Sequence, residues 1–430
     1  MAAPYKGNLV FWRDLTPFPT PLHCPTERSP HVLIIGGGVI GLTNAWILLD
    51  HGYRVTVVSK EWASYGTTQR LTSQIAGALW EYPPAVCGQH SDATSLKDSN
   101  RWCMVAYYIF DAIATDKDLA ERFGVKMRET HSFFPKPIEE DAVQVAKMLE
   151  IMNSGVKGFT QNAKGTAESG VNPTHGAIYA YTHLAPIIDT DIAMSFLASL
   201  VTSKGATLLT RTITGNLLFQ ESSLLTQYSA SIILNCTGLA GTELAGDTTC
   251  YPIRGALLRV INDGTVFPKL EHALTIPAPI GAPETTKGNG SGIIFLVPRN
   301  NTILLAGGIT EPHIPALDLT LSSPIIQRMR ARCESFFPGL KNAKLDPKYP
   351  LAQGLRPFRG RNVRVEREDR VHARKERGRG SRIVHCYGHG GAGWSLGFGC
   401  AGDVLGVVEG ILDDRASSPA AQRKESKRLE

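Results

Sequence analysis

A glycine-rich turn between two apolar segments constrains the fold of this chain more than any other feature. Residues 32–35 are apolar and lead into Gly36, Gly38 and Gly41, and a second apolar segment at 54–59 follows the intervening helical stretch. This order is typical of a βαβ unit. In the GxGxxG spacing, successive glycines permit a tight turn, the approach of a pyrophosphate and close packing of the helix on the strand. The sequence therefore predicts that a dinucleotide binds at the start of this helix.

The turn alone does not distinguish NAD from FAD. An acidic side chain at the end of the second strand usually binds the adenosine ribose. Here Ser59 and Lys60 occupy that place, and Glu61 follows one position late. Ser59 can still hydrogen-bond a ribose hydroxyl. Lys60 either neutralises a phosphate or is only solvated, and the sequence favours neither.

Elements of the same α/β kind recur along the chain, separated by segments of a different character. They occur near residues 31–80, 186–244 and 381–412, whereas residues 250–310 hold several short strands. We therefore expect one discontinuous α/β domain with a second domain inserted twice. The predicted limits are 1–30 for a proline-rich N-terminal extension, 31–90, 186–244 and 351–412 for the cofactor domain, 91–185 and 245–350 for the substrate domain, and 413–430 for a flexible tail.

The formal net charge of +6 is concentrated in two segments. Residues 364–382 hold eight basic and four acidic side chains, and residues 423–430 hold four basic and two acidic ones. The first segment contains no Phe, Tyr or Trp that could stack on bases, so a nucleic-acid partner is not expected. We expect residues 364–382 to form a solvated loop instead.

Other features exclude further classes of protein. No run of 18 or more apolar residues is present, so no membrane span is expected. The eight cysteines show neither CxxC nor a Cys/His metal spacing, which predicts no metal site and a reducing, intracellular compartment. The N-terminus lacks a signal pattern, and the sequence ends in Arg428-Leu429-Glu430 rather than Ser-Lys-Leu, so that cytoplasm and peroxisome both stay open.

Four segments together resemble one known family. They are the glycine turn, residues 72–80 (TSQIAGALW), residues 354–357 (GLRP) with 365–368 after them, and residues 384–395 (VHCYGHGGAGWS). On these residues the chain resembles the D-amino-acid oxidase and D-aspartate oxidase family of FAD enzymes over about residues 30–412. The resemblance implies an α/β fold, with a discontinuous Rossmann-like FAD-binding domain and an inserted α+β substrate domain built on a mixed sheet.

The resemblance also implies that FAD is bound non-covalently, although Cys386 and Cys400 lie in or near the fourth segment. Successive glycines there would expose backbone N–H groups to the flavin, and a helix N-terminus would add positive potential. The cofactor-binding residues that it implies are Gly36, Gly38, Val39, Ile40, Gly41, Ser59, Lys60, Thr72, Ser73, Gly77, Ala78, Leu79, Ile213, Thr237, Gly390, Gly391, Gly393 and Ser395.

For the substrate, the resemblance implies a carboxylate clamp. Arg356, in the Gly-x-Arg-Pro motif, is expected to bind the carboxylate with its planar fork, and the carbonyl of Gly391 to accept the amine. Phe295 stands where the family has a carboxylate-binding tyrosine, and Ser291 where mammalian relatives have another. The clamp would thus lose one or two hydrogen bonds of about 1.5–3 kcal/mol each. The possible replacements are Tyr251, Tyr179 and Tyr181.

We therefore expect an FAD-dependent oxidase that removes a hydride from the α carbon of a D-amino acid or an amino-acid-like substrate. The products would be an imino acid, then a 2-oxo acid and ammonia, with hydrogen peroxide from O2. Phe295 favours an alternative, an FAD-dependent oxidoreductase of a secondary amine or specialised metabolite; a second alternative is a flavin-binding protein without turnover. His385 and His389 are expected to be structural. The expected partners are the small substrate and O2, and a homodimer is left open.

Overall fold

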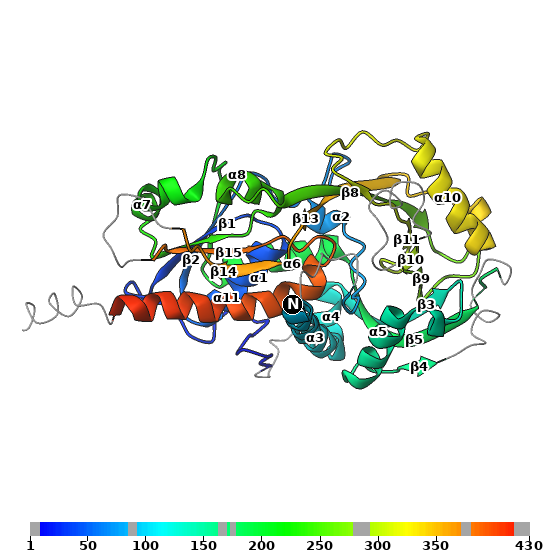
Figure 1. Ribbon diagram of the computed structural model, residues 1–430, viewed down its shortest axis with the longest axis horizontal. Helices are drawn as coiled ribbons and strands as arrows, with labels where there is room; N and C mark the ends of the chain where they lie inside the picture. The colour runs from blue at the N-terminus through cyan, green and yellow to red at the C-terminus, as the bar shows by residue number, and fades with distance from the viewer. Residues whose placement is uncertain are drawn as a thin grey trace, which may run out of the picture.

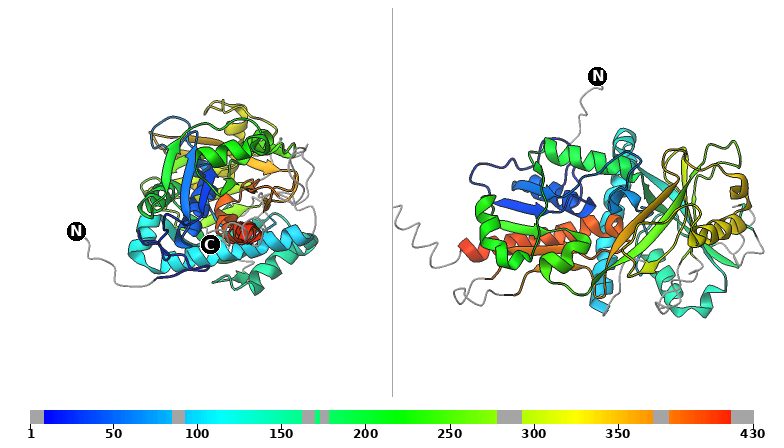
Figure 2. Two further views of the ribbon diagram at one scale, coloured as in Figure 1. Left: turned by 90° about the vertical axis from the view of Figure 1, so that its left-hand side faces the viewer. Right: turned by 90° about the horizontal axis from the view of Figure 1, so that it is seen from above.

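The computed structural model describes residues 9–84, 93–161, 170–172, 178–277, 293–370 and 380–416. Within them the chain forms two β-sheets that lie side by side along the long axis of the molecule, with the smaller sheet on the left of Figure 1. Seen from above, the two halves are again side by side, and long strands run from one toward the other (Figure 2). The predicted α/β fold, with a Rossmann-like part and a second part on a mixed sheet, is confirmed.

The smaller sheet has six strands in the order β14-β15-β7-β1-β2-β6. Neighbours pair in parallel except β14 and β15, which are antiparallel. The central strands are apolar and buried on both faces, as expected of a parallel sheet that helices cover. The strands are β1 (His31–Ile35), β2 (Arg54–Ser59), β6 (Thr207–Thr210), β7 (Ile232–Asn235), β14 (Arg364–Arg367) and β15 (Ile383–Tyr387).

Helices cover both faces of this sheet. On one face, α1 (Val39–Asp50) packs against α6 (Thr190–Ser203) and α11 (Gly393–Ala416), and α11 packs on α3 (Ala93–Thr115). On the other face, α7 (Leu217–Gln227) contacts β7 and β15. Because β1 ends at the glycine turn and α1 begins there, the N-terminus of α1 lies at the carboxyl edge of the sheet, where such folds bind ligands.

The larger sheet is mixed, since β3 pairs with β9 in parallel and its other pairs are antiparallel. Its order is β12-β8-β11-β10-β9-β3-β5-β4, and β13 pairs with β8 off this path. Helix α10 (Pro324–Phe336) packs on β10 and β11. The strands are β3 (Val125–Phe134), β4 (Thr160–Gln161), β5 (Tyr179–Ile188), β8 (Cys250–Ile261), β9 (Ala273–Ile276), β10 (Ile294–Pro298), β11 (Ile303–Gly307), β12 (Glu311–Pro312) and β13 (Leu351–Arg359). The other α-helices of the described residues are α2 (Thr72–Ile75), α4 (Lys117–Phe123), α5 (Ala142–Asn153) and α8 (Gly241–Ala245).

The position of strand β13 in the fold differs from the predicted domain limits. It begins at Leu351, where the cofactor domain was expected to resume, yet all nine of its residues pair with β8. It therefore belongs to the larger sheet. The sequence did not reveal this because strand pairing depends on a partner about 100 residues away along the chain.

The charged segment at 364–382 begins as strand β14, so the predicted solvated loop is wrong for residues 364–367 and for the buried Glu368. Glu368 is buried and pairs with Arg370 at 2.5 Å and with Nε2 of His385 at 3.1 Å. Hydrogen bonds from these two residues hold the pKa of Glu368 well below its usual range, although burial opposes the shift. Opposite charges within the segment thus compensate one another and allow burial. Residues 371–379 lie outside the described residues.

Helix α11 is long and apolar enough to cross a membrane over Gly393–Asp414, judged by length and hydropathy alone. In the fold, 67% of its apolar window is buried inside the protein, and the helix packs between α1 and α3. A core helix that is enclosed on several sides has the same composition as a membrane span.

The N-terminal extension is tied to α1 by one buried carboxylate. Asp50 accepts hydrogen bonds from the backbone N–H groups of Thr16 and Leu22 and from the indole of Trp46. Its counter-charge is the ammonium of Lys204, 2.5 Å away, and both side chains are fully buried. Burial lowers the pKa of Lys204, and the hydrogen bond to Asp50 opposes that shift.

Replacing Lys204 by methionine is expected to lower the free energy of unfolding by about 3–5 kcal/mol, because it leaves a buried carboxylate without a counter-charge. The matched control is Lys157→Met. Lys157 pairs with Asp111 at 2.6 Å, but its side chain is 57% exposed, so its loss is expected to cost about 1 kcal/mol or less. Denaturant unfolding of both variants measures the difference, and equal losses would contradict this account of Asp50.

Candidate active site

The glycine turn leaves no room for side chains where the strand meets α1. Gly36 has a φ of +114°, in the region that favours glycine. A Cβ on Gly41 would lie 1.9 Å from the carbonyl oxygen of Gly36, whereas one on Gly38 would meet the Ser73 hydroxyl at 3.1 Å. Gly41 thus serves the packing of the helix on the turn. Among the predicted cofactor residues, it alone does not line the cavity described below.

Ser59 connects the end of β2 to this turn. Its Oγ accepts a hydrogen bond from the N–H of Gly37 at 3.1 Å and donates one to the carbonyl of Glu61 at 2.6 Å. The hydroxyl can therefore accept a hydrogen bond from a ribose but has no second proton to donate. Lys60 is exposed and lines the cavity beside it.

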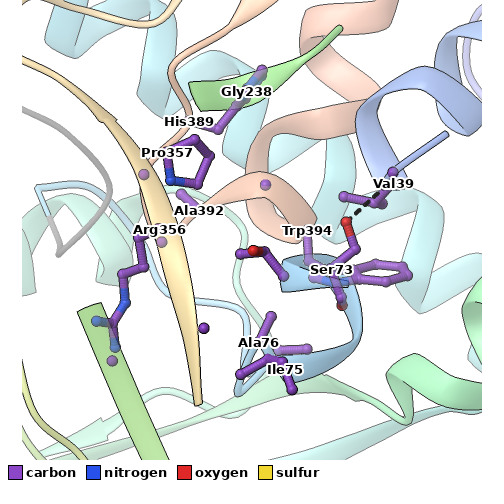
Figure 3. A pocket seen from close by; sticks show the side chains of 18 of the residues that line it. Val39, Ser73, Ile75, Ala76, Gly238, Arg356, Pro357, His389, Ala392 and Trp394 are labelled. Carbon is purple, nitrogen blue, oxygen red and sulfur yellow. Dashed lines mark hydrogen bonds between the residues drawn. The ribbon is translucent and has the colours of Figure 1, made fainter. Parts of the chain in front are cut away.

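Ser73 joins three parts of the site. Its Oγ accepts a hydrogen bond from the N–H of Val39 at 3.0 Å, and its carbonyl accepts one from the indole of Trp394 at 2.9 Å. Figure 3 shows these side chains together on one side of the pocket. Thr72, beside it, donates to the carbonyl of Leu355 on β13 at 3.1 Å. The segment at 72–80 therefore links α1, β13 and α11.

A second glycine-rich loop precedes α11 and is fixed to β13. Gly388 and Gly390 have φ values of +86° and +56°, which favour glycine. The N–H of Gly390 donates to the carbonyl of Pro357 at 2.9 Å. This bond brings the exposed Gly391 close to the strand that carries Arg356.

A cavity of about 720 Å³ connects these parts and continues over the larger sheet. Its walls include the N-terminus of α1 and both glycine-rich loops. The glycines of these loops have no side chains that would separate their backbone from a ligand in the cavity. These features fit a dinucleotide such as FAD. Except for Gly41, all predicted site residues line it: Gly36, Gly38, Val39, Ile40, Ser59, Lys60, Thr72, Ser73, Gly77, Ala78, Leu79, Ile213, Thr237, Phe295, Arg356, Gly390, Gly391, Gly393 and Ser395.

Arg356 lies on β13 and lines this cavity (Figure 3). Gly255 on β8 leaves space for it, since a Cβ there would lie 2.3 Å from Nη1. Within the described residues, its side chain makes one hydrogen bond, from Nη1 to the carbonyl of Ile309 at 3.2 Å, and no ion pair. Burial lowers the pKa of Arg356 to about 10. A cation that is removed from water without a counter-charge is costly, so this position fits an anionic group of a ligand.

The ring of Phe295 packs on Gly77. A Cβ on Gly77 would lie 2.4 Å from Cζ of Phe295, so the ring occupies the space that a side chain at Gly77 would need. A tyrosine hydroxyl, which is attached at Cζ, would add an atom to this close contact. Glycine at position 77 is thus fitted to the ring of Phe295.

Phe295→Tyr is expected to weaken FAD binding by about tenfold or more rather than to improve activity, because the added hydroxyl overpacks the contact with Gly77 by about 1–3 kcal/mol. Titration of the apoprotein with FAD measures the effect. The control is Phe219→Tyr, at a site where the ring is 82% exposed, and no change is expected there. Normal FAD affinity together with a rise in turnover for Phe295→Tyr would contradict the argument.

The larger sheet carries a polar surface that was not predicted from the sequence. Strands β3, β5 and β9 contribute Thr130, Ser132, His183 and Thr275 to the cavity, and α5 contributes Lys147. Along a strand, every second side chain lies on the same face of the sheet. The polar residues at this spacing could therefore have indicated the polar surface, once it was known which strands pair. Of the tyrosines considered for the clamp, Tyr181 lines the cavity, whereas Tyr179 and Tyr251 do not. Ser291 lies outside the described residues.

The structure places His385, which was predicted to be structural, away from the cavity. It is fully buried outside the cavity, with Nε2 3.1 Å from Glu368 and Nδ1 3.3 Å from the amide of Asn235. Burial lowers the pKa of His385. His389 lines the cavity, and Cys386 lines it while Cys400 does not. Across the described residues, no group of three or more His, Cys, Asp or Glu side chains could hold a metal ion.

Comparison with known proteins shows the family to which the chain belongs. A D-amino-acid oxidase of Streptomyces coelicolor is 29% identical over 391 residues, covering 87% of this chain and 95% of that protein. One of Rubrobacter xylanophilus is 27% identical, covering 88% and 96%. Among solved structures, glycine oxidase from Geobacillus kaustophilus superimposes with a TM-score of 0.63 at 18% identity, covering 89% of this chain and 95% of that one. Residues 31–405 match the FAD dependent oxidoreductase family (DAO), and the chain is therefore a member of that family.

Proposed function

We propose that this protein is an FAD-dependent oxidase of D-amino acids. The net reaction converts a D-amino acid, O2 and water to a 2-oxo acid, ammonia and hydrogen peroxide, by way of an imino acid that water hydrolyses. Bound FAD would supply the acceptor for the hydride that leaves the α carbon and would pass the electrons to O2. The relatives named D-amino-acid oxidase, each matched over most of its length, support this substrate class.

The observation that carries the proposal is the uncompensated charge of Arg356. Within the described residues, its guanidinium donates a hydrogen bond to a carbonyl and pairs with no carboxylate. The same cavity is lined by the two glycine-rich loops that fit a dinucleotide. A substrate carboxylate would supply the missing counter-charge, and the fork would fix it with two hydrogen bonds. Fixing the carboxylate orients the α carbon, which is the main contribution that this chemistry needs from the protein.

The neighbouring loop supplies the second contact. Gly391 is exposed in the cavity, and the hydrogen bond from Gly390 to Pro357 holds its loop next to β13, the strand that carries Arg356. The carbonyl of Gly391 would accept a hydrogen bond from the substrate amine in its neutral form. Phe295, packed on Gly77, would form an apolar wall that excludes water from the α carbon.

A second candidate, an FAD-dependent oxidoreductase of a secondary amine, is favoured by Phe295, which gives the clamp no tyrosine hydroxyl. A peroxide assay on the FAD-loaded protein distinguishes the two candidate functions. The compounds tested are D-amino acids, their N-methyl derivatives and amines without a carboxylate. We expect peroxide with primary D-amino acids in preference to both other groups. Turnover of N-methyl derivatives alone would favour the second candidate, and no peroxide with any compound would favour a binding protein without turnover.

A further inference from the structure

We propose that the polar end of the cavity, which we call the amide subsite, selects D-amino acids whose side chain ends in an uncharged hydrogen-bond donor, a carboxamide or ureido group, and that His183 accepts its hydrogen bond. This inference rests on the proposed oxidation of D-amino acids and adds the class of side chain. The amide subsite consists of Thr130, Ser132, His183, Glu81 and Lys147, all of which line the cavity.

Strand register places the amide subsite beyond the clamp on one face of the larger sheet. Phe295 pairs with Thr275, Thr275 with Ser132, and Ser132 with Tyr181. Paired residues direct their side chains to the same face, and neighbouring strands are about 4.8 Å apart, so the row extends roughly 14 Å from Phe295. Thr130 and His183 are paired in the next row on this face. A substrate anchored at Arg356 would therefore extend its side chain along this face.

His183 presents a hydrogen-bond acceptor. Its Nδ1 lies 3.3 Å from the carbonyl of Leu184, which can only accept, so Nδ1 carries the proton and Nε2 has the lone pair. Within the described residues, Nε2 has no hydrogen-bond partner. Burial lowers the pKa of His183 to about 4, so the ring is neutral near pH 7. A group that binds at Nε2 must therefore bring its own proton.

The other groups of the amide subsite offer further acceptors. The hydroxyl of Thr130 is buried and has no partner in the described part of the chain. Glu81 accepts a hydrogen bond from Lys147 through Oε1 at 3.1 Å and leaves Oε2 available. Lys147 is buried, and Glu81 and the carbonyl of Pro84 already accept hydrogen bonds from its ammonium. The groups left for a ligand are therefore two acceptors, Nε2 of His183 and Oε2 of Glu81, and the Thr130 hydroxyl, which can accept or donate.

Charge excludes the ionised alternatives. Glu81 and Lys147 already neutralise each other, so a charged side chain would enter without a counter-ion. A carboxylate would meet the acceptors His183 and Glu81. A cation would be placed near Lys147, whose charge is one cause of the lowered pKa of His183. A carboxamide or ureido group has N–H donors and no charge, and it satisfies the free acceptors.

The test uses the FAD-loaded protein and pairs of substrates of matched shape. D-Glutamine with D-glutamate, and D-citrulline with D-arginine, each differ in charge at one length, and D-methionine supplies an apolar reference. We expect kcat/KM for D-glutamine and D-citrulline to exceed that of their charged counterparts by about tenfold or more. His183→Phe should lower kcat/KM for D-glutamine and D-citrulline about tenfold and change that of D-methionine less than twofold, since the ring is retained but the acceptor is lost.

Two further variants show whether the effect belongs to the acceptor. His183→Gln keeps an acceptor oxygen and should recover part of the loss. His131→Phe, on the opposite face of the neighbouring strand β3, should leave all ratios unchanged. If D-amino acids are oxidised but the charged partners react as well as the uncharged ones, or His183→Phe leaves their ratios unchanged, this inference is overturned alone. If no D-amino acid is oxidised, the proposed function falls, and the inference with it.

Discussion

Replacing Arg356 by leucine is expected to lower kcat/KM for D-amino acids by about 10²–10⁴-fold. The guanidinium is proposed to make two charge-assisted hydrogen bonds to the substrate carboxylate, and each is worth about 1.5–3 kcal/mol. Together they correspond to a loss of this size, because each 1.4 kcal/mol is a factor of about ten. FAD binding should persist, since the glycine turn and the second loop are untouched. The free energy of unfolding should not fall, because the substitution removes a buried cation without a counter-charge.

The measurements are steady-state kinetics, the visible spectrum of the bound flavin and denaturant unfolding. Arg330→Leu is the matched control, since Arg330 lies on α10 and its partner there is Glu334, at 2.7 Å. It should leave kcat/KM unchanged. Arg356→Lys keeps the charge without the fork and should recover only part of the activity. An Arg356→Leu variant that oxidises D-amino acids normally would show that the carboxylate is bound elsewhere.

Gly41→Ala should abolish stable FAD binding. A Cβ at this position would lie 1.9 Å from the carbonyl oxygen of Gly36, and the clash is with backbone that cannot move aside without opening the turn. Because that turn is the predicted binding site of the cofactor's pyrophosphate, displacing it removes the cofactor site and also destabilises the βαβ unit. We expect recovered protein to be largely colourless and its free energy of unfolding to fall by about 3 kcal/mol or more, at the upper end for overpacking.

The control for this variant is Gly410→Ala in α11. Nothing lies within 4 Å of a Cβ built on Gly410, and alanine is favoured over glycine in a helix by about 1 kcal/mol. This variant should keep its FAD and be slightly more stable. The ratio of flavin to protein absorbance, together with denaturant unfolding, distinguishes the two. A yellow, normally stable Gly41→Ala protein would refute the argument from the turn.

Several of the predicted site residues that line the cavity belong to motifs governed by local geometry. Gly36 and Gly41 are adjacent to the apolar strand that they end, so their spacing alone indicates the turn. The loop before α11 and the position of Arg356 followed from short motifs in the same way. In each case the residues that interact are within a few positions of each other, or the motif itself is distinctive.

The parts that could not be predicted depend on distant partners. The orientation of Phe295 follows from its contact with Gly77, more than 200 residues away in the chain. The pairing of β13 with β8 and the amide subsite likewise arise only when strands far apart in sequence come into register. The charged segment was misread because a count of charges does not show that Glu368 pairs with His385 in the interior.

The central claim is that FAD in this cavity oxidises D-amino acids held by Arg356. It is tested most directly by mixing the FAD-loaded protein with D- and L-enantiomers of the same amino acids without oxygen and following the visible flavin absorbance. We expect that D-enantiomers bleach the flavin, that L-enantiomers do not, and that Arg356→Leu removes the difference. Bleaching by neither enantiomer, or equally by both, would contradict it.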